Sequence, residues 1–162
     1  SKLLGERELM KHAPARWLIL RTAWLYGPGG ASFPRTMIDL ARAGKPLRVV
    51  NDQIGAPTYT RDLAAATLDL VDSGSSGVLH VTSAGQTSWF DFAHAIFERF
   101  DLRATLSPIT SADWKSQRPA SAVRPAYSVL DLKPAEQAMG HVMRDWREGL
   151  ADYRAEMGPL GA

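Results

Sequence analysis

A continuous apolar run occupies residues 17–20, and the polar residues Arg21 and Thr22 end it. Such a short run is typical of a parallel strand that is buried on both faces. Two aromatic residues, Trp24 and Tyr26, follow, and then a Pro-Gly-Gly turn. Because ligands of open α/β sheets bind outside the carboxyl ends of the strands, this segment is the first candidate for a binding site. A well-packed core strand followed by an ordinary turn would show the same pattern.

Further segments carry apolar residues at helical spacing, and short apolar runs separate them. Ser32 and Thr60 are placed to cap helices, and residues 88–91, Ser-Trp-Phe-Asp, have the spacing of a capping box. We predict strands at 16–22, 47–50 and 78–82, and helices at 2–12, 32–44, 60–72, 88–100, 134–140 and 143–157. The alternation of strands and helices predicts an α/β fold.

Residues 104–131 differ from the rest of the chain. They contain Pro108, Pro119 and Pro125 and show no clear helical period. Long irregular segments inside compact domains are usually functional or disordered. Trp114 and Tyr127 favour order, so we expect an ordered and irregular segment here.

Composition excludes several classes of function. The 162 residues are 45% hydrophobic and 22% charged, values typical of a globular domain. No run approaches the roughly 20 apolar residues of a membrane span, and no signal peptide is evident, so we expect no membrane partner. The net charge of +2 is too small and too scattered to indicate nucleic acid binding. With no cysteine and no secretion signal, a cytoplasmic location is expected.

Several catalytic chemistries lack their motifs. The four histidines stand singly, without an HExxH motif or a carboxylate at ligand spacing, so no metal site is predicted. No G-x-S-x-G motif occurs. The glycines at 27, 29 and 30 do not form a G-x-G-x-x-G motif, although a phosphate could lie at the N-terminus of the Ser32 helix.

The remaining groups suit a phosphorylated, sugar-like ligand. Arginines bind phosphate through paired hydrogen bonds, and Trp24 offers a flat apolar face to a sugar ring. The candidate arginines are Arg35, Arg118 and Arg124, and the candidates that could read hydroxyls or a base edge are Asn51, Asp52, Gln53 and Thr58. Each residue alone has an alternative role on the surface or in the core, but their concentration in loops favours binding.

The sequence resembles the dTDP-4-dehydrorhamnose reductases, which are extended short-chain dehydrogenase/reductases. The matching segments run in order along the chain. They are Lys2-Leu-Leu-Gly-Glu6, Leu20-Arg-Thr-Ala-Trp-Leu-Tyr-Gly27, Phe33-Pro-Arg-Thr-Met37, Asn51-Asp-Gln-Ile-Gly-Ala-Pro-Thr58, Ser88-Trp-Phe-Asp-Phe92 and Arg124-Pro-Ala-Tyr-Ser-Val-Leu-Asp131. The Asn-Asp-Gln and Arg-Pro-x-x-Ser segments are specific to the family, whereas the Arg-Thr-x-Trp segment indicates only the wider superfamily.

The resemblance implies a reaction and a cofactor. Hydride would pass from NADPH, or NADH, to the C4 ketone of a dTDP-6-deoxy-hexulose, giving dTDP-L-rhamnose. Lys2 matches the lysine of the family's Tyr-x-x-x-Lys motif. An ammonium beside the tyrosine favours the phenolate and lowers its pKa from about 10 toward working pH. Lys2 would also hold the nicotinamide ribose.

The resemblance also assigns binding roles. Thr22 and Ala23 would border the nicotinamide, and Trp24 would face the sugar. Gln53 and Arg124 would lie on the nucleotide or pyrophosphate side. Arg35 remains a substrate-binding candidate because an arginine can pair with phosphate.

The chain departs from the family in what it lacks. The tyrosine partner of Lys2 and the glycine-rich dinucleotide loop would precede Ser1, and Ser32 stands where relatives often have Asn. We therefore expect the C-terminal half of a reductase, inactive by itself. Residues 1–30 and 60–83 would form the last parallel strands of an NAD(P)-binding Rossmann-type fold with their helices. Residues 31–59 and 84–162 would form mainly a small α+β substrate-binding lobe.

The missing half implies an interaction. The strand at 16–22 would lack a sheet neighbour, so a homodimer or another association through its exposed edge is expected. Two alternatives to the reductase stay open. One is a reductase-like, non-catalytic regulatory subunit that binds nucleotide, and the other is an NDP-sugar epimerase or dehydratase of the same superfamily.

Overall fold

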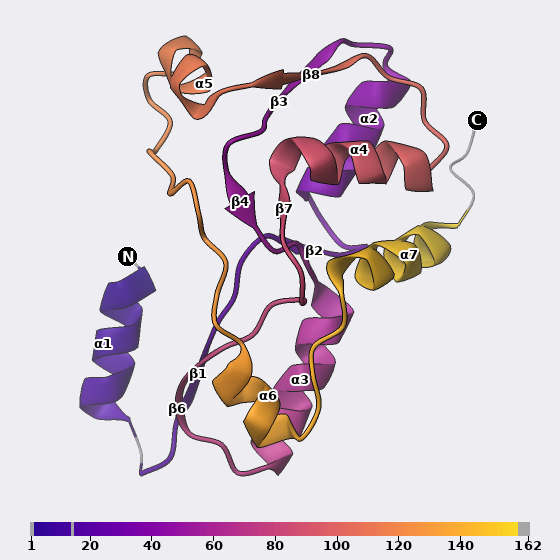
Figure 1. Ribbon diagram of the computed structural model, residues 1–162. Coiled ribbons are helices and arrows are strands. Elements are labelled where there is room, and N and C mark those ends of the chain that lie inside the picture. Colours follow the sequence, from indigo (N-terminus) through magenta and orange to yellow (C-terminus); the bar gives the residue numbers. More distant parts are fainter. Residues whose placement is uncertain (1, 14, 159–162) are drawn as a thin grey trace.

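The computed structural model describes residues 2–13 and 15–158 and shows a mixed α/β chain (Figure 1). The helices are α1 (Lys2–His12), α2 (Phe33–Arg42), α3 (Thr60–Asp72), α4 (Trp89–Arg99), α5 (Ser111–Gln117), α6 (Lys133–Met139) and α7 (Trp146–Met157). The strands are β1 (Leu18–Arg21), β2 (Leu25–Tyr26), β3 (Leu47–Val50), β4 (Ile54–Gly55), β5 (Thr58–Tyr59), β6 (Gly77–His80), β7 (Thr87–Ser88) and β8 (Leu106–Ile109). The predicted α/β class is therefore confirmed.

The strands form pairs rather than one continuous sheet. Strand β1 pairs with β6, β2 with β5 and β3 with β8, all parallel, whereas β4 and β7 are antiparallel. The register of β1 and β6 aligns Leu18 with Gly77 and Arg21 with His80. Carboxyl ends of parallel strands are where α/β folds bind ligands, and the segment after β1 leads into the cavity described below.

Strand β1 has one strand neighbour within the described part of the chain. The parallel direction that its sequence predicts is confirmed, but its burial on both faces is not, because Leu18, Ile19 and Leu20 are only half-buried. The second edge of β1 carries no strand in the described residues, as the sequence predicts. Helix α1 lies near β1 in Figure 1 and is joined to it by an ion pair between Arg21 and Glu6, at 2.6 Å.

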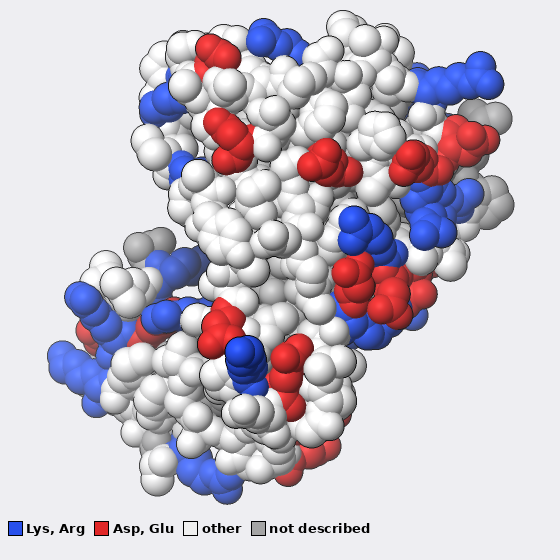
Figure 2. All heavy atoms as spheres, viewed as in Figure 1, with Lys and Arg blue, Asp and Glu red and all other residues white. Residues whose placement is uncertain are grey.

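Two apolar cores hold the chain together. One joins α2, α4 and α7 around Tyr26 and Tyr59, and the other joins α3 and α6 to β6 around Leu70 and Val81. Figure 2 shows an upper and a lower body with a narrower middle, and in Figure 1 the two helix groups occupy these two bodies. Ala135 of α6 packs with the lower core, although it lies within the 84–162 segment expected to form mainly the substrate lobe. The division into two parts stays a prediction.

Helix capping follows the sequence at two of the three predicted positions. Ser32 and Ser88 accept hydrogen bonds from backbone N–H groups of the first turns of α2 and α4, as predicted. Thr60 is not a cap, because the helix begins with it and Tyr59 precedes it without a side-chain bond. Its hydroxyl lies against Gly27 instead, where an added Cβ would overlap with Thr60 Oγ1.

The irregular segment 104–131 contains two elements that the sequence pattern missed. Strand β8 reads Leu-Ser-Pro-Ile and pairs with β3, and α5 spans only seven residues. Helix α5 starts at a cap, since Thr110 accepts a hydrogen bond from Asp113 N. A strand that contains proline and a two-turn helix are too short to show a period, so neighbouring elements decide their structure.

Gly149 of α7 lies close against Tyr59, Asp62 and Tyr26 and provides a test of the packing. A Cβ there would lie 2.9 Å from Tyr59 Cβ, 3.1 Å from Asp62 Oδ2 and 3.2 Å from Tyr26 Oη. Alanine normally stabilises a helix interior relative to glycine, by about 0.5–1 kcal/mol. We expect Gly149→Ala to destabilise the chain instead, by about 1–3 kcal/mol, because it overpacks this contact. Urea unfolding measures the difference.

The matched control is Gly5→Ala, which makes the same change in α1, where no atom stands within 4 Å of the added Cβ. It should be neutral or slightly stabilising. A Gly149→Ala variant as stable as the wild type would show that α7 does not pack this closely.

Candidate functional site

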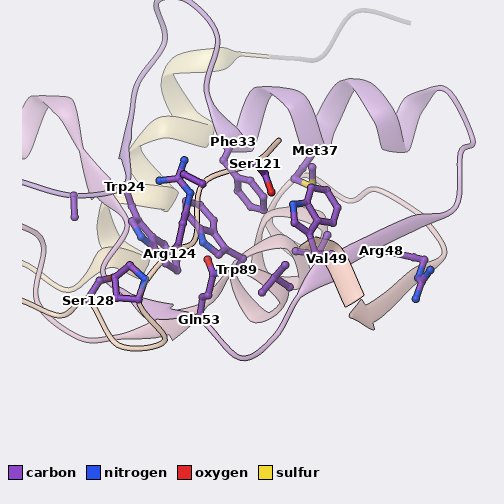
Figure 3. A pocket seen from close by; sticks show the side chains of 15 residues that line it. Trp24, Phe33, Met37, Arg48, Val49, Gln53, Trp89, Ser121, Arg124 and Ser128 are labelled. Carbon is purple, nitrogen blue, oxygen red and sulfur yellow. The ribbon is translucent and has the colours of Figure 1, made fainter. Parts of the chain in front are cut away.

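A cavity of about 810 Å³ lies between the upper helices and the segment that follows α5. Its walls are residues that lie far apart in the sequence. They are Ala23, Trp24, Phe33, Met37, Arg48, Val49, Val50, Gln53, Trp89, Trp114, Ser121, Ala122, Arg124, Pro125 and Ser128. Figure 3 shows Trp24, Trp89, Gln53 and Arg124 at one end of the cavity and Arg48 at the other.

Two stacked indoles form the aromatic end of the cavity. The ring centroids of Trp24 and Trp89 are 3.5 Å apart and their planes differ by 12°. Trp24 follows β1, and Trp89 is the first residue of α4, directly after the Ser88 cap. Phe33 packs against Trp89 at 4.6 Å between ring centroids. One face of Trp24 is therefore covered by Trp89, which leaves at most the other face to a ligand.

The backbone of Trp24 adopts an unusual conformation. Its φ of 50° lies in the left-handed region, which costs a non-glycine residue about 1 kcal/mol or more. Such strain persists only where the surroundings enforce it, and it gathers at functional sites. Gly55 lies directly against the indole, as an added Cβ there would stand 2.5 Å from Trp24 Cε2.

Polar contacts attach the β3–β4 loop to α5. The hydroxyl of Ser111 donates to Asp52 Oδ1 at 2.6 Å and accepts from Gln53 Nε2 at 2.8 Å. The backbone N–H of Ser111 also donates to the Asp52 carboxylate at 3.0 Å. The hydroxyl bond, followed by the backbone bond, keeps the pKa of Asp52 below its ordinary value of 3.8, against the opposing effect of partial burial. These bonds hold Gln53 at the cavity wall.

The segment from Arg118 to Ser128 closes another side of the cavity. Lys115 Nζ donates to the carbonyl oxygens of Pro119 and Ser121. At the far end, Ser128 donates through its backbone and side chain to Ile54 O. Arg124 lies between these anchors, exposed and at the cavity wall. Its positively charged guanidinium suits a phosphate oxygen of a ligand in the cavity.

The structure brings together four of the site residues that the sequence proposed. Ala23, Trp24, Gln53 and Arg124 all line the cavity. The roles assigned to them stay predictions.

The other proposed residues lie outside this cavity wall. Lys2 is exposed on α1, Arg35 pairs with Asp39 at 3.1 Å on α2, and the guanidinium of Arg118 lies over the Trp114 ring. Thr58 is fully buried and donates to Ala56 O. Thr22 is partly buried at the end of β1, and its hydroxyl has no hydrogen-bond partner among the described residues. Asn51 and Asp52 are exposed and are not among the lining residues.

Sequence reasoning misses most of the aromatic and apolar wall. The sequence pattern places Trp89 only within the predicted helix at 88–100, and Trp114 only in the irregular segment 104–131. No local signal separates Trp89 from the other apolar residues of its helix, because Trp89 also packs against the upper core. Nothing in the sequence indicates that Trp89 stacks on Trp24, which is 65 positions away.

The described residues contain neither a metal-binding cluster nor a membrane-spanning helix. No group of three or more His, Asp or Glu side chains is arranged to bind a metal ion in the part of the chain that the structure describes. Within residues 2–13 and 15–158, no helix has the length and apolar character of a membrane span.

The tyrosines of the upper core are not poised to ionise, because burial raises the pKa values of Tyr26, Tyr59 and Tyr153.

Comparison with known proteins identifies the family. The model of the RmlD substrate binding domain matches residues 1–158. The chain belongs to the RmlD substrate binding domain family. The resemblance to dTDP-4-dehydrorhamnose reductases is thereby confirmed.

Relatives of this RmlD-family chain include enzymes of known structure. It is 44% identical over 156 residues to the spore coat polysaccharide biosynthesis protein SpsK of Bacillus subtilis, covering 96% of this chain and 53% of that protein. It matches a dTDP-4-dehydrorhamnose reductase of Clostridium acetobutylicum with a TM-score of 0.87 and 39% identity, over 96% of this chain and 54% of the other. It also matches the dTDP-4-dehydrorhamnose reductase of Bacillus anthracis, which was solved in complex with NADP. The TM-score is 0.84 and the identity 32%, over 94% of this chain and 52% of the other. The chain thus spans about half the length of the relatives it matches.

The link between Ser111 and Asp52 yields a prediction about pH. In Ser111→Ala, Asp52 loses the hydroxyl bond that lowers its pKa most, so its titration midpoint should rise toward 3.8. A carboxylate with a lowered pKa stabilises the fold above its unfolded pKa, and this contribution disappears as pH falls through the folded pKa. The variant should therefore lose stability at neutral pH and approach the wild type in acid.

Carbon-detected NMR of the Asp52 carboxyl measures the midpoint. Ser116→Ala is the control, because Ser116 lies on the same helix and donates only to Asp113 O. An Asp52 midpoint that is the same in the wild type and Ser111→Ala would contradict the assignment.

Proposed function

We propose that this chain is the substrate-binding half of an NADPH-dependent dTDP-4-dehydrorhamnose reductase and binds a dTDP-linked sugar in the cavity. The complete enzyme would reduce the C4 ketone of dTDP-4-dehydro-6-deoxy-L-mannose to dTDP-L-rhamnose. The observation that carries the proposal is the joint presence of Trp24, Gln53 and Arg124 at one end of a single cavity. Solved relatives of similar fold bear this enzyme's name.

The chemistry of the cavity wall suits each part of such a ligand. Arg124 offers paired N–H donors to the diphosphate, and Gln53 offers an amide that can donate and accept. The indoles of Trp24 and Trp114 offer flat apolar surfaces for the sugar or the base. The apolar side chains Met37 and Val49 line the same cavity and would exclude water from the bound rings.

A nicotinamide cofactor fits the end of β1. The partly buried Thr22 carries a hydroxyl without a partner in the described residues, and such a group costs free energy unless something pairs with it. Thr22 and Ala23 would border the nicotinamide of NADPH, and Lys2 would hold its ribose. When bound, the cofactor supplies the hydride. The Bacillus anthracis relative was solved in complex with NADP, which supports this choice.

The resemblance assigns proton transfer to a tyrosine four residues before the lysine at the position of Lys2, which lies outside residues 1–162. The role of Lys2 would be to lower the pKa of that tyrosine through its charge. In the complete enzyme, further strands of the sheet would join β1 at its open edge.

Calorimetric titration with dTDP and with thymidine tests the proposal. The wild-type chain should bind dTDP, and Arg124→Ala should weaken that binding by at least about tenfold. The reason is the loss of hydrogen bonds to a charged group, which contribute about 1.5–3 kcal/mol. Thymidine binding should change little, because thymidine carries no phosphate.

Arg103→Ala provides the control, because Arg103 is exposed and lines a different surface hollow, between α4 and β8. It should bind dTDP as the wild type does. Failure of the wild type to bind dTDP, or an Arg124→Ala variant with wild-type affinity, would contradict the proposed function.

A further inference from the structure

Trp24 is held in place by contacts from two segments that are distant in sequence. Its left-handed backbone conformation, with φ of 50°, is unfavourable for a tryptophan in isolation. Something around the residue must supply the compensating interactions. Its indole stacks on the Trp89 ring and lies directly against Gly55.

Gly55 has no side chain, and the Trp24 indole occupies the space that a side chain would fill. A Cβ at position 55 would lie 2.5 Å from Trp24 Cε2, 2.6 Å from Cζ2 and 2.8 Å from Nε1. These distances are well inside carbon–carbon contact, so any larger residue would displace the ring. Gly55 is not among the residues with positive φ, so its backbone would tolerate alanine. The requirement for glycine here is therefore one of space and not of backbone conformation.

Stacking on Trp89 is the attractive interaction that holds the Trp24 ring. Its ring stacks on Trp24 at 3.5 Å, and Phe33 packs against it at 4.6 Å between centroids. The Ser88 cap fixes the backbone of Trp89 at the start of α4. A rigid first turn thus presents the second indole at a fixed position.

We propose that Gly55 and Trp89 are positioning residues that together fix the Trp24 ring, and so determine how the cavity discriminates the sugar of its ligand. The choice of dTDP-L-rhamnose as the ligand rests on the proposed function. The contacts that fix the Trp24 ring do not depend on it. Strand β4, which contains Gly55, pairs with β7 directly before Trp89, so one strand pair brings both contacts to Trp24. Substituting Gly55 displaces the ring without removing any residue of the cavity wall, because Gly55 is not among the lining residues.

Two measurements on Gly55→Ala test the proposal. Stacked indoles give an exciton couplet in far-ultraviolet circular dichroism, and this couplet should be lost when the added methyl group displaces Trp24. In calorimetry, the affinity for dTDP-L-rhamnose should fall by about tenfold, while the affinity for dTDP should stay within about twofold. Gly29→Ala is the matched control, because no atom lies within 4 Å of its added Cβ and its φ is not positive.

A second pair of variants keeps the test decisive if Gly55→Ala does not fold. Trp89→Phe retains an aromatic ring and should keep most of the preference for dTDP-L-rhamnose over dTDP, although the indole couplet disappears. Trp89→Leu should lose both this preference and the couplet. A merely structural role for Trp89 would instead lower the affinities for both ligands together.

The results also separate this proposal from the proposed function. A couplet that persists in Gly55→Ala, or equal losses for dTDP and dTDP-L-rhamnose, would overturn the positioning role. A wild-type chain that shows the couplet but binds neither nucleotide would overturn the proposed function. In that case, loss of the couplet in Gly55→Ala would still support the fixing of the Trp24 ring.

Discussion

The packing around Tyr26 is the constraint on which the rest of the upper body depends. Its ring lies 5.4–5.6 Å from those of Tyr59, Phe92 and Tyr153, which come from β5, α4 and α7. Tyr26 is 2% exposed, and burial raises the pKa of its phenol far above the usual range. Because Tyr26 follows Trp24 by two residues, this aromatic packing fixes β2 and with it the exit of β1. The packing of the core therefore sets the position of Trp24, the candidate residue for binding the sugar.

The wall of the cavity combines rigid and tethered parts. Trp89 begins α4, which packs into the upper core, and Trp24 lies in the bend between β1 and β2, two residues before the buried Tyr26. Gln53 donates a hydrogen bond to Ser111, and the segment that carries Arg124 is held by hydrogen bonds that Lys115 and Ser128 donate. Such a division suits a ligand that carries both a ring and a charged group. Rings require fixed surfaces, and a diphosphate is held by exposed charge that can adjust.

Local signals in the sequence are sufficient for much of the fold. The caps Ser32 and Ser88, the strand at 47–50 and the helix at 88–100 all follow from short-range periodicity and capping chemistry, and the structure confirms them. Strand β8 and helix α5 do not follow, because they depend on pairing with β3 and on the Asp52–Ser111 contact. The family resemblance singles out Trp24, Gln53 and Arg124 as site residues. The Trp24–Trp89 stack is a tertiary contact, which local patterns cannot reveal.

The most direct test of this account uses the five tryptophans as reporters. Indole N–H signals of the chain would be followed by two-dimensional NMR during titration with dTDP-L-rhamnose. The signals of Trp24, Trp89 and Trp114, which line the cavity, should shift with one saturation curve, while those of Trp17 and Trp146 stay unchanged. Shifts confined to Trp17 or Trp146, or no shift at saturating ligand, would contradict the assignment of this cavity as the sugar-nucleotide site.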